Sequence, residues 1–129
     1  CYGYGIKANI DWKETLGAEW RQYEKIFPAI DASPIGHVAI ECRNSHVPLD
    51  ILALLTRTTV QAGVIDVASD TVETPEDVVK TIEAVMKFVP KERIVATTNC
   101  GMAPMRRTVA EAKLKALGDG AKLARERLG

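Results

Sequence analysis

Two cysteines and a glutamate occupy equivalent places in this sequence, each at the end of a segment typical of a β-strand. Cys1 ends a first strand, Glu41 closes a second, and Cys100 follows a later apolar run. In a parallel α/β protein the carboxyl ends of the strands meet at one edge, where ligands and catalytic groups gather. Two thiolates and a carboxylate suit Zn²⁺ in a tetrahedral site. The pattern predicts a metal site that needs a fourth protein ligand or leaves one position open for substrate.

Side-chain alternation sorts the neighbouring candidates. Successive residues of a strand point to opposite faces, so Glu41 shares a face with His37 and Ala39, and Cys42 falls on the other. The first face is smaller and more polar and fits a barrel interior, whereas Cys42 fits a buried structural thiol. In the next strand the same alternation turns Asp66 inward. No certain catalytic residue is identified, and Asp66 is a candidate to support the metal ligands.

The same residues also have simpler structural interpretations. A cysteine in an α/β protein usually packs as a small apolar side chain, and Glu41 is also placed to pair with Arg43. His37, lower on the inward face, is more often a hydrogen-bonded core histidine. Arg106 and Arg107 fit an exposed charged surface better than an anion-binding site. Residue types alone leave both interpretations open.

Helices and strands are predicted from caps and from apolar spacing. The predicted helices span residues 11–27, 48–56, 75–89 and 105–128, and the predicted strands span 36–42, 63–67 and 94–98. Asp11 with Glu14 fits a capping box, and Thr74 fits an N-cap. Prolines end the first and third helices. Gly118 and Gly120 weaken the last helix, so we expect a kink or break there.

Strands and helices alternate along the chain, which implies right-handed parallel β-α units. The strands are apolar at most positions, as expected when both faces are covered. Four such units make half of a (β/α)8 TIM barrel or a small doubly wound sheet. No Gly-rich dinucleotide fingerprint or P-loop follows a strand, so we favour the half-barrel. Because the chain starts at Cys1 without an initiator methionine, we expect it to be a piece of a longer polypeptide.

The composition argues against several classes of partner. Lysine plus arginine and aspartate plus glutamate number 17 each, so the formal net charge is zero and gives no electrostatic reason to expect nucleic acid or an anionic membrane. No apolar run approaches the roughly 20 residues that cross a bilayer. Three cysteines at irregular spacing argue against a secreted disulfide framework and for a reduced, cytoplasmic setting.

Three segments together resemble one enzyme family. The segments are Thr98–Met102, Ile40–Glu41, and Asp66–Ser69 with the following Thr74–Glu76. In order and spacing they are similar to the C-terminal catalytic domain of cobalamin-independent methionine synthase. The resemblance covers nearly all 129 residues. That family uses a (β/α)8 barrel. The resemblance implies that residues 1–129 form a single partial domain, the C-terminal half of the barrel with its last four β/α units.

The resemblance also implies a zinc site and an activity. In the family a His-x-Cys pair, a glutamate and a second cysteine hold zinc, which activates homocysteine for methylation to methionine. Matched position by position, these ligands are Cys1, Glu41 and Cys100, and the histidine lies two positions before Cys1, outside this sequence. The homocysteine amino and carboxylate contacts belong largely to the other half. The implied partners are homocysteine, a methyl donor and the N-terminal half of the barrel.

One position departs from the family pattern. The folate-using members carry a histidine where this chain has Ala68. Release of a tetrahydrofolate amine needs protonation by a positioned acid. The departure therefore disfavours methyl-folate and favours a corrinoid protein or another activated methyl compound as donor. An acid elsewhere in the protein is an alternative that the sequence leaves open.

Two other functions stay open. One is a methyltransferase of the same superfamily that acts on another thiol, such as coenzyme M. The other is an inactive half-barrel, folded only with its other half or by self-association, because an isolated half leaves two open strand edges. Uroporphyrinogen decarboxylase shares the broad fold but needs no zinc, and the thiol-glutamate-thiol set argues against it.

Overall fold

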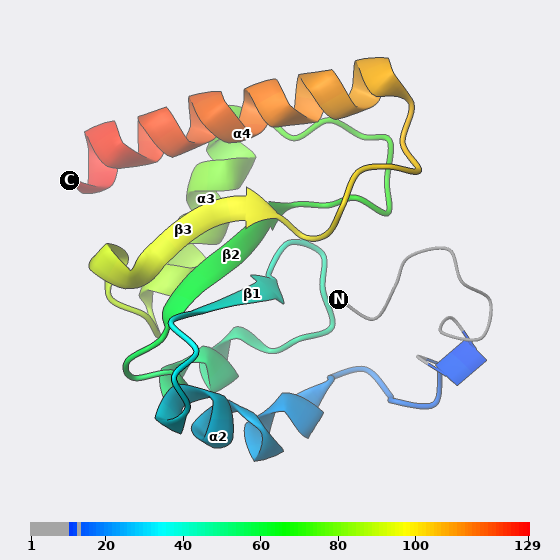
Figure 1. The fold of residues 1–129 in the computed structure, drawn as a ribbon. Coiled ribbons are helices and arrows are strands. Elements are labelled where there is room, and N and C mark those ends of the chain that lie inside the picture. The colour runs from blue at the N-terminus through cyan, green and yellow to red at the C-terminus, as the bar shows by residue number, and fades with distance from the viewer. Residues whose placement is uncertain (1–10, 13) are drawn as a thin grey trace.

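The fold is built on a parallel sheet whose strands neighbour one another in sequence order (Figure 1). The computed structural model describes residues 11–12 and 14–129. The described strands are β1 (His37–Glu41), β2 (Thr59–Ile65) and β3 (Ile94–Thr98), hydrogen-bonded in the order β1-β2-β3 and all parallel. From residue 21 onward the helical elements are η1 (Arg21–Lys25), α2 (Phe27–Ala32), η2 (Leu49–Leu54), α3 (Pro75–Met86), η3 (Lys91–Arg93) and α4 (Arg107–Leu128). This arrangement confirms the α/β class with parallel strands that alternate with helices.

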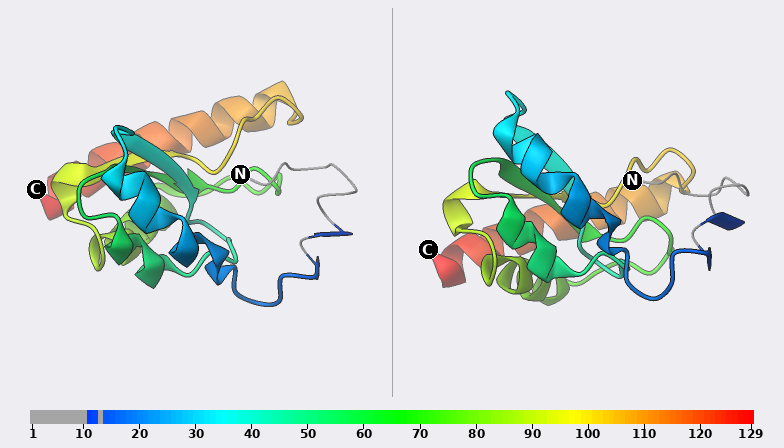
Figure 2. Two further views of the ribbon diagram at one scale, coloured as in Figure 1. Left: turned by 60° about the horizontal axis from the view of Figure 1, so that its bottom comes forward. Right: turned by 90° about the horizontal axis from the view of Figure 1, so that it is seen from below.

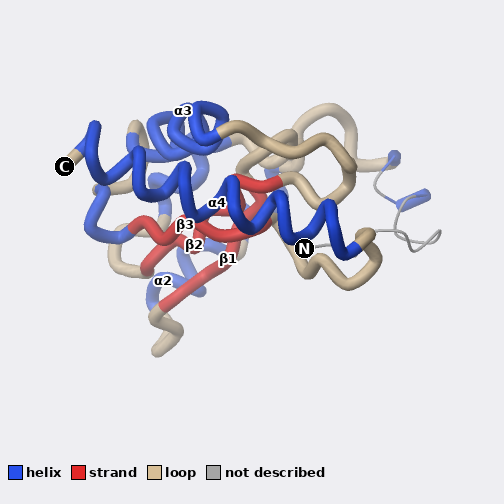
Figure 3. Tube along the Cα trace, turned by 90° about the horizontal axis from the view of Figure 1, so that it is seen from above, coloured by secondary structure: helices blue, strands red, loops and turns tan. Residues whose placement is uncertain are grey.

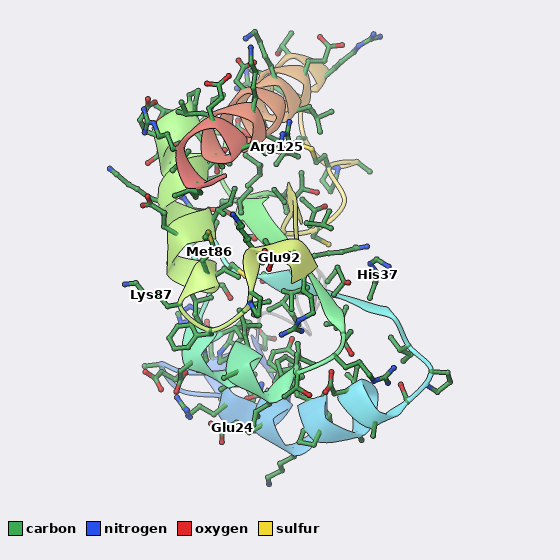
Figure 4. All side chains as sticks on the ribbon, turned by 90° about the vertical axis from the view of Figure 1, so that its left-hand side faces the viewer. Glu24, His37, Met86, Lys87, Glu92 and Arg125 are labelled. Atoms are coloured by element: carbon green, nitrogen blue, oxygen red, sulfur yellow. The ribbon has the colours of Figure 1, made fainter. Side chains whose placement is uncertain are left out.

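The two faces of the sheet differ in burial. One face carries Val60 and Ala62, both in the hydrophobic core. The other carries His37 and Val95, which are exposed. Figure 4 shows α4, α3 and α2 around one side of the sheet, with His37 pointing to the side that has no helix. The alternation predicted for the strand of Glu41 is therefore confirmed, and the barrel-interior face is open in the described part of the chain.

Helix α3 begins with a capping box. Thr74 Oγ1 accepts the N–H of Asp77 at 3.2 Å, and the Asp77 carboxylate accepts the N–H of Thr74 at 3.0 Å. Pro75 occupies the first helical position, where its missing N–H costs no intrahelical bond. The predicted start of this helix is confirmed. Its last residue is Met86, somewhat before the proline at which we predict the end.

Helix α4 runs continuously through Gly118 and Gly120, so the predicted break is wrong. Helices α4 and α3 pack side by side (Figure 3). A Cβ at Gly120 of α4 would come within 2.4 Å of the Val78 Cβ of α3. A Cβ at Gly118 would meet nothing within 4 Å. Close approach of the two helices, rather than chain flexibility, explains why residue 120 is glycine.

The segment before β1 is not the single helix that we predict for residues 11–27. Gly17 has a φ of 75°, in the left-handed region that favours glycine, and the chain then forms η1 and α2 as separate elements. Pro28 lies in the first turn of α2 instead of ending a helix. Phe27 is nonetheless almost completely buried, and α2 packs beside η2 (Figure 2). Apolar residues of this segment are therefore buried, as their spacing predicts, although they do not belong to one continuous helix.

Two further elements differ from their predicted bounds. The short helix predicted for residues 48–56 is the 3₁₀ helix η2 over residues 49–54, and β2 begins at Thr59 instead of Gly63. The start of β2 is fixed by Asp31, whose carboxylate accepts N–H groups from residues 56, 57 and 58. The Thr56 hydroxyl, together with the N–H groups of residues 58 and 57, holds the pKa of the Asp31 carboxyl well below its usual range. In the described part, no helix is both long and apolar enough to cross a membrane.

Replacing Gly120 by alanine is expected to destabilise the protein by about 1–3 kcal/mol, because the added methyl group pushes α4 away from α3. Gly118→Ala is the matched control on the same helix. Its methyl group meets nothing, and alanine favours a helix over glycine by about 1 kcal/mol, so this variant is expected to gain stability. Urea unfolding measures both, and equal shifts for the two variants would contradict the packing argument.

Candidate functional site

The carboxyl ends of the strands bring two of the predicted ligands to one edge. Glu41 ends β1 and pairs in register with Gly63 of β2, which pairs with Thr97 of β3. Neighbouring strands lie about 4.8 Å apart, so the backbones of Glu41 and Thr97 lie about 10 Å apart. Cys100 follows β3 and is half-buried, and Glu41 is only 8% exposed. Glu41 and Cys100 therefore stand at the same edge with one strand between them.

The third predicted ligand, Cys1, lies outside the described residues. Within residues 11–12 and 14–129, no three His, Cys, Asp or Glu side chains are grouped so as to hold a metal ion. The described part contributes at most a pair of ligands. Metal binding by Cys1, Glu41 and Cys100 therefore stays a prediction.

Cys42 is separated from its neighbour Glu41 by its environment. Burial raises the pKa of the Cys42 thiol to about 12. The thiol packs against the hydrophobic core and donates to the Ile40 carbonyl at 3.4 Å. A protonated core thiol is a poor metal ligand, which agrees with its predicted structural role.

Asp66 organises the loop between β2 and α3. One carboxylate oxygen accepts the N–H of Ala68 at 2.8 Å, and the other accepts the Asn44 side-chain amide at 3.0 Å. The residue is 8% exposed. The two carboxylate oxygens thus connect the loop between β2 and α3 with Asn44 in the turn after β1. The support of the metal ligands predicted for Asp66 stays a prediction.

A buried ion pair, which the sequence analysis did not predict, also holds the loop between β2 and α3. Lys113 Nζ lies 2.9 Å from Glu73 Oε2, with side-chain exposures of 0% and 4%. Glu73 Oε1 accepts the N–H of Asp66 at 2.9 Å, and Lys113 also donates to the Thr71 carbonyl. The available signal was helical spacing, since Lys113 falls on the buried stripe of α4 that continues through Ala116.

The two arginines at the start of α4 have acidic partners at the surface. Arg106 reaches Asp70 at 3.0 Å and so joins the loops that follow β3 and β2, which lie together in Figure 1. Arg107 pairs with Glu111 one turn later at 2.6 Å. This agrees with an exposed charged surface for both arginines.

The comparisons with known proteins agree with this architecture. Residues 20–123 match the family model described as cobalamin-independent synthase, catalytic domain. The chain belongs to this family. It is similar to the structure of a B12-independent methionine synthase from Shewanella sp. W3-18-1 in complex with selenomethionine, with a TM-score of 0.91 and 51% identity, over 99% of this chain and 38% of that one. The fold is accordingly part of the family's (β/α)8 barrel.

Curated relatives point in two directions. A methionine synthase from Thermococcus kodakarensis is 31% identical over 84% of this chain and 33% of its own length. A 2-hydroxypropyl-CoM lyase from Xanthobacter autotrophicus is 42% identical over 52% of this chain and 18% of its own length. The chain thus spans about a third or less of these relatives.

Lys113→Met is expected to destabilise the protein by about 3–5 kcal/mol, because it leaves the Glu73 carboxylate buried without its counter-ion. Lys115→Met is the matched control, since Lys115 pairs with Asp119 on the exposed side of the same helix and such pairs contribute about 0–1 kcal/mol. Chemical denaturation measures both. Adding Glu73→Leu to Lys113→Met should recover part of the loss, and a double variant less stable than Lys113→Met would count against the explanation.

Proposed function

We propose that this chain forms part of the active site of a zinc-dependent methyltransferase that methylates the thiol of homocysteine to give methionine. The observation that carries the proposal is the 51% identity, over 99% of this chain, to the Shewanella B12-independent methionine synthase bound to selenomethionine. The family match over residues 20–123 supports the same reaction class.

The donor types at the carboxyl edge fit a zinc ion. Glu41 supplies a buried carboxylate and Cys100 a half-buried thiol, and both are ordinary zinc ligands. Cys42 does not fit, because its thiol packs against the hydrophobic core on the other face of the sheet from Glu41. The residues that would hold the ion are Cys1, Glu41 and Cys100. A histidine two positions before Cys1 would complete the set, as it does in the family.

Zinc supplies one piece of chemistry, the deprotonation of a bound substrate thiol at neutral pH. Glu41 and the cysteine ligands place negative charge beside the substrate sulfur and keep it nucleophilic. The new bond between sulfur and the methyl carbon forms as the bond from that carbon to the donor breaks, and the thiol proton passes to solvent.

The loop between β2 and α3 bears on the identity of the methyl donor. Ala68 stands where folate-using members carry a histidine, and its N–H donates to Asp66. Both oxygens of Asp66 already accept hydrogen bonds. The other acids of the loop are also paired, Asp70 with Arg106 and Glu73 with Lys113. The loop therefore lacks the histidine that would protonate a departing folate nitrogen, and its three carboxylates are already engaged. We propose a corrinoid protein or another activated methyl compound as the donor.

A second candidate substrate is a different thiol. The 2-hydroxypropyl-CoM lyase from Xanthobacter autotrophicus, 42% identical over 67 residues, is named for a coenzyme M compound. A zinc site that activates one thiol can activate another, since the deprotonation step is the same. Coenzyme M is therefore the alternative acceptor to set against homocysteine.

Further β/α units are proposed to complete the barrel around this chain. The described part leaves the interior face of the sheet open, with Val95 45% exposed. A groove of about 550 Å³ also opens beside β3, between α3 and α4, and residues such as Met86, Ile94 and Leu128 line it. The match to only 38% of the Shewanella chain leaves enough protein to cover both. The isolated piece is expected to be inactive or to self-associate.

The test uses the intact protein that contains this chain. It is expected to hold one zinc ion per active site and to methylate homocysteine faster than coenzyme M. It should do so with methylcobalamin, a model corrinoid donor, and not with methyltetrahydrofolate. Glu41→Gln and Cys100→Ala are expected to lose both metal and activity, since each removes a ligand.

Cys42→Ala is the matched control for Cys100→Ala. It removes a thiol one residue from Glu41 but on the core side of the sheet, so zinc content and activity should persist. Zinc retained in Cys100→Ala but lost in Cys42→Ala would overturn the ligand assignment. Faster turnover of coenzyme M would favour the second acceptor, and turnover with methyltetrahydrofolate alone would refute the donor proposal.

A further inference from the structure

Asn99, the residue before Cys100, connects the ends of all three strands. Its backbone N–H donates to the Ile65 carbonyl at the end of β2, at 2.9 Å. Its side-chain Nδ2 donates to the Arg43 carbonyl, just beyond β1, at 2.8 Å. The residue is 7% exposed. One buried amide therefore fixes the end of β3 against the turn that follows Glu41.

Gly63 makes this approach possible. A Cβ at Gly63 would lie 2.4 Å from Asn99 Oδ1 and 2.8 Å from the Asn99 Cα, distances that real atoms do not adopt. The Gly63 carbonyl in turn accepts the N–H groups of Cys42 and Arg43, at 3.0 and 2.9 Å. The pairing of β2 with β3 shifts between Gly63 and Ile65, an irregularity often found beside active sites.

These contacts form a short path between the two predicted ligands. Arg43 is two residues from Glu41, and Asn99 is next to Cys100. The hydrogen bond from Asn99 to Arg43 therefore joins the chain beside one predicted ligand to the chain beside the other. Ligand distances in a metal site are held to about 0.2 Å, and residues that orient ligands commonly change metal affinity about 10–100-fold.

We propose that Asn99 and Gly63 form a latch that sets the separation of Glu41 and Cys100 and thereby the affinity of the site for its metal. The latch rests on the zinc site of the proposed function. Asn99 is a positioning residue, since its side chain acts through the Arg43 carbonyl. Among the described residues Asn99 Oδ1 has no hydrogen-bond partner, so the side chain is held through Nδ2. Asn99→Ala removes that hold completely.

The experiment replaces zinc by Co²⁺ in the intact protein, because thiolate-to-cobalt charge-transfer bands report the ligand geometry directly. Asn99→Ala is expected to weaken Co²⁺ and Zn²⁺ binding about 10-fold or more and to shift or weaken those bands. Gly63→Ala should act in the same direction, since its methyl group forces Asn99 away. Affinities come from competition with a chromophoric chelator.

Asp31→Ala is the matched control. It also removes a side chain that ties backbone groups together, but it does so at the amino end of β2, far from the ligands. It should lower stability and leave the spectrum and the affinity unchanged. Equal metal affinity and spectra in Asn99→Ala and the parent would overturn the latch while leaving the zinc site intact. Equal losses in Asn99→Ala and Asp31→Ala would overturn it as well. A parent protein without cobalt-thiolate bands would overturn both the latch and the proposed zinc site.

Discussion

The architecture of the candidate site depends on the close approach of β3 to β2 at Gly63. Parallel pairing alone brings the ends of β1, β2 and β3 to one edge, but it fixes neither the path of the chain after each strand nor the ligand separation. The missing side chain at Gly63 lets Asn99 enter the sheet edge, and the amide of Asn99 then binds the turn after β1. We propose that these contacts set the positions of Glu41 and Cys100.

A second constraint acts on the loop that faces the same edge. Taking the Glu73 carboxylate and the Lys113 ammonium out of water is expensive, and their attraction offsets the cost only because both groups also bind the loop backbone. Such a pair is weak support for stability but strongly determines shape, since few loop conformations satisfy every bond. The loop carries Asp66 and Ala68, the positions at which the choice of methyl donor is proposed to be made.

The sequence predicted those elements whose signals are local. The start of α3 follows from Thr74 and Asp77, neighbours that cap each other, and the bounds of β3 were predicted as observed. The predictions were wrong where contacts between residues distant in the sequence determine the structure. From the sequence alone Gly120 indicates a break in the helix, whereas in the structure it allows α3 to pack closely against α4. The apolar residues of 11–27 have helical spacing, yet Gly17 interrupts the helix. For the site, alternation placed His37 and Cys42 on their correct faces, but the Asn99 latch joins residues 56 positions apart and left no local signal.

The central claim is that Cys1, Glu41 and Cys100 share one cation at the edge of the barrel. X-ray absorption at the zinc edge of the intact protein tests it most directly, because sulfur and lighter ligands give distinct distances. The account predicts two sulfur ligands at about 2.3 Å and nitrogen or oxygen ligands at about 2.0–2.2 Å, with one sulfur lost in Cys100→Ala. A zinc shell without sulfur, or one that Cys100→Ala leaves unchanged, would contradict it.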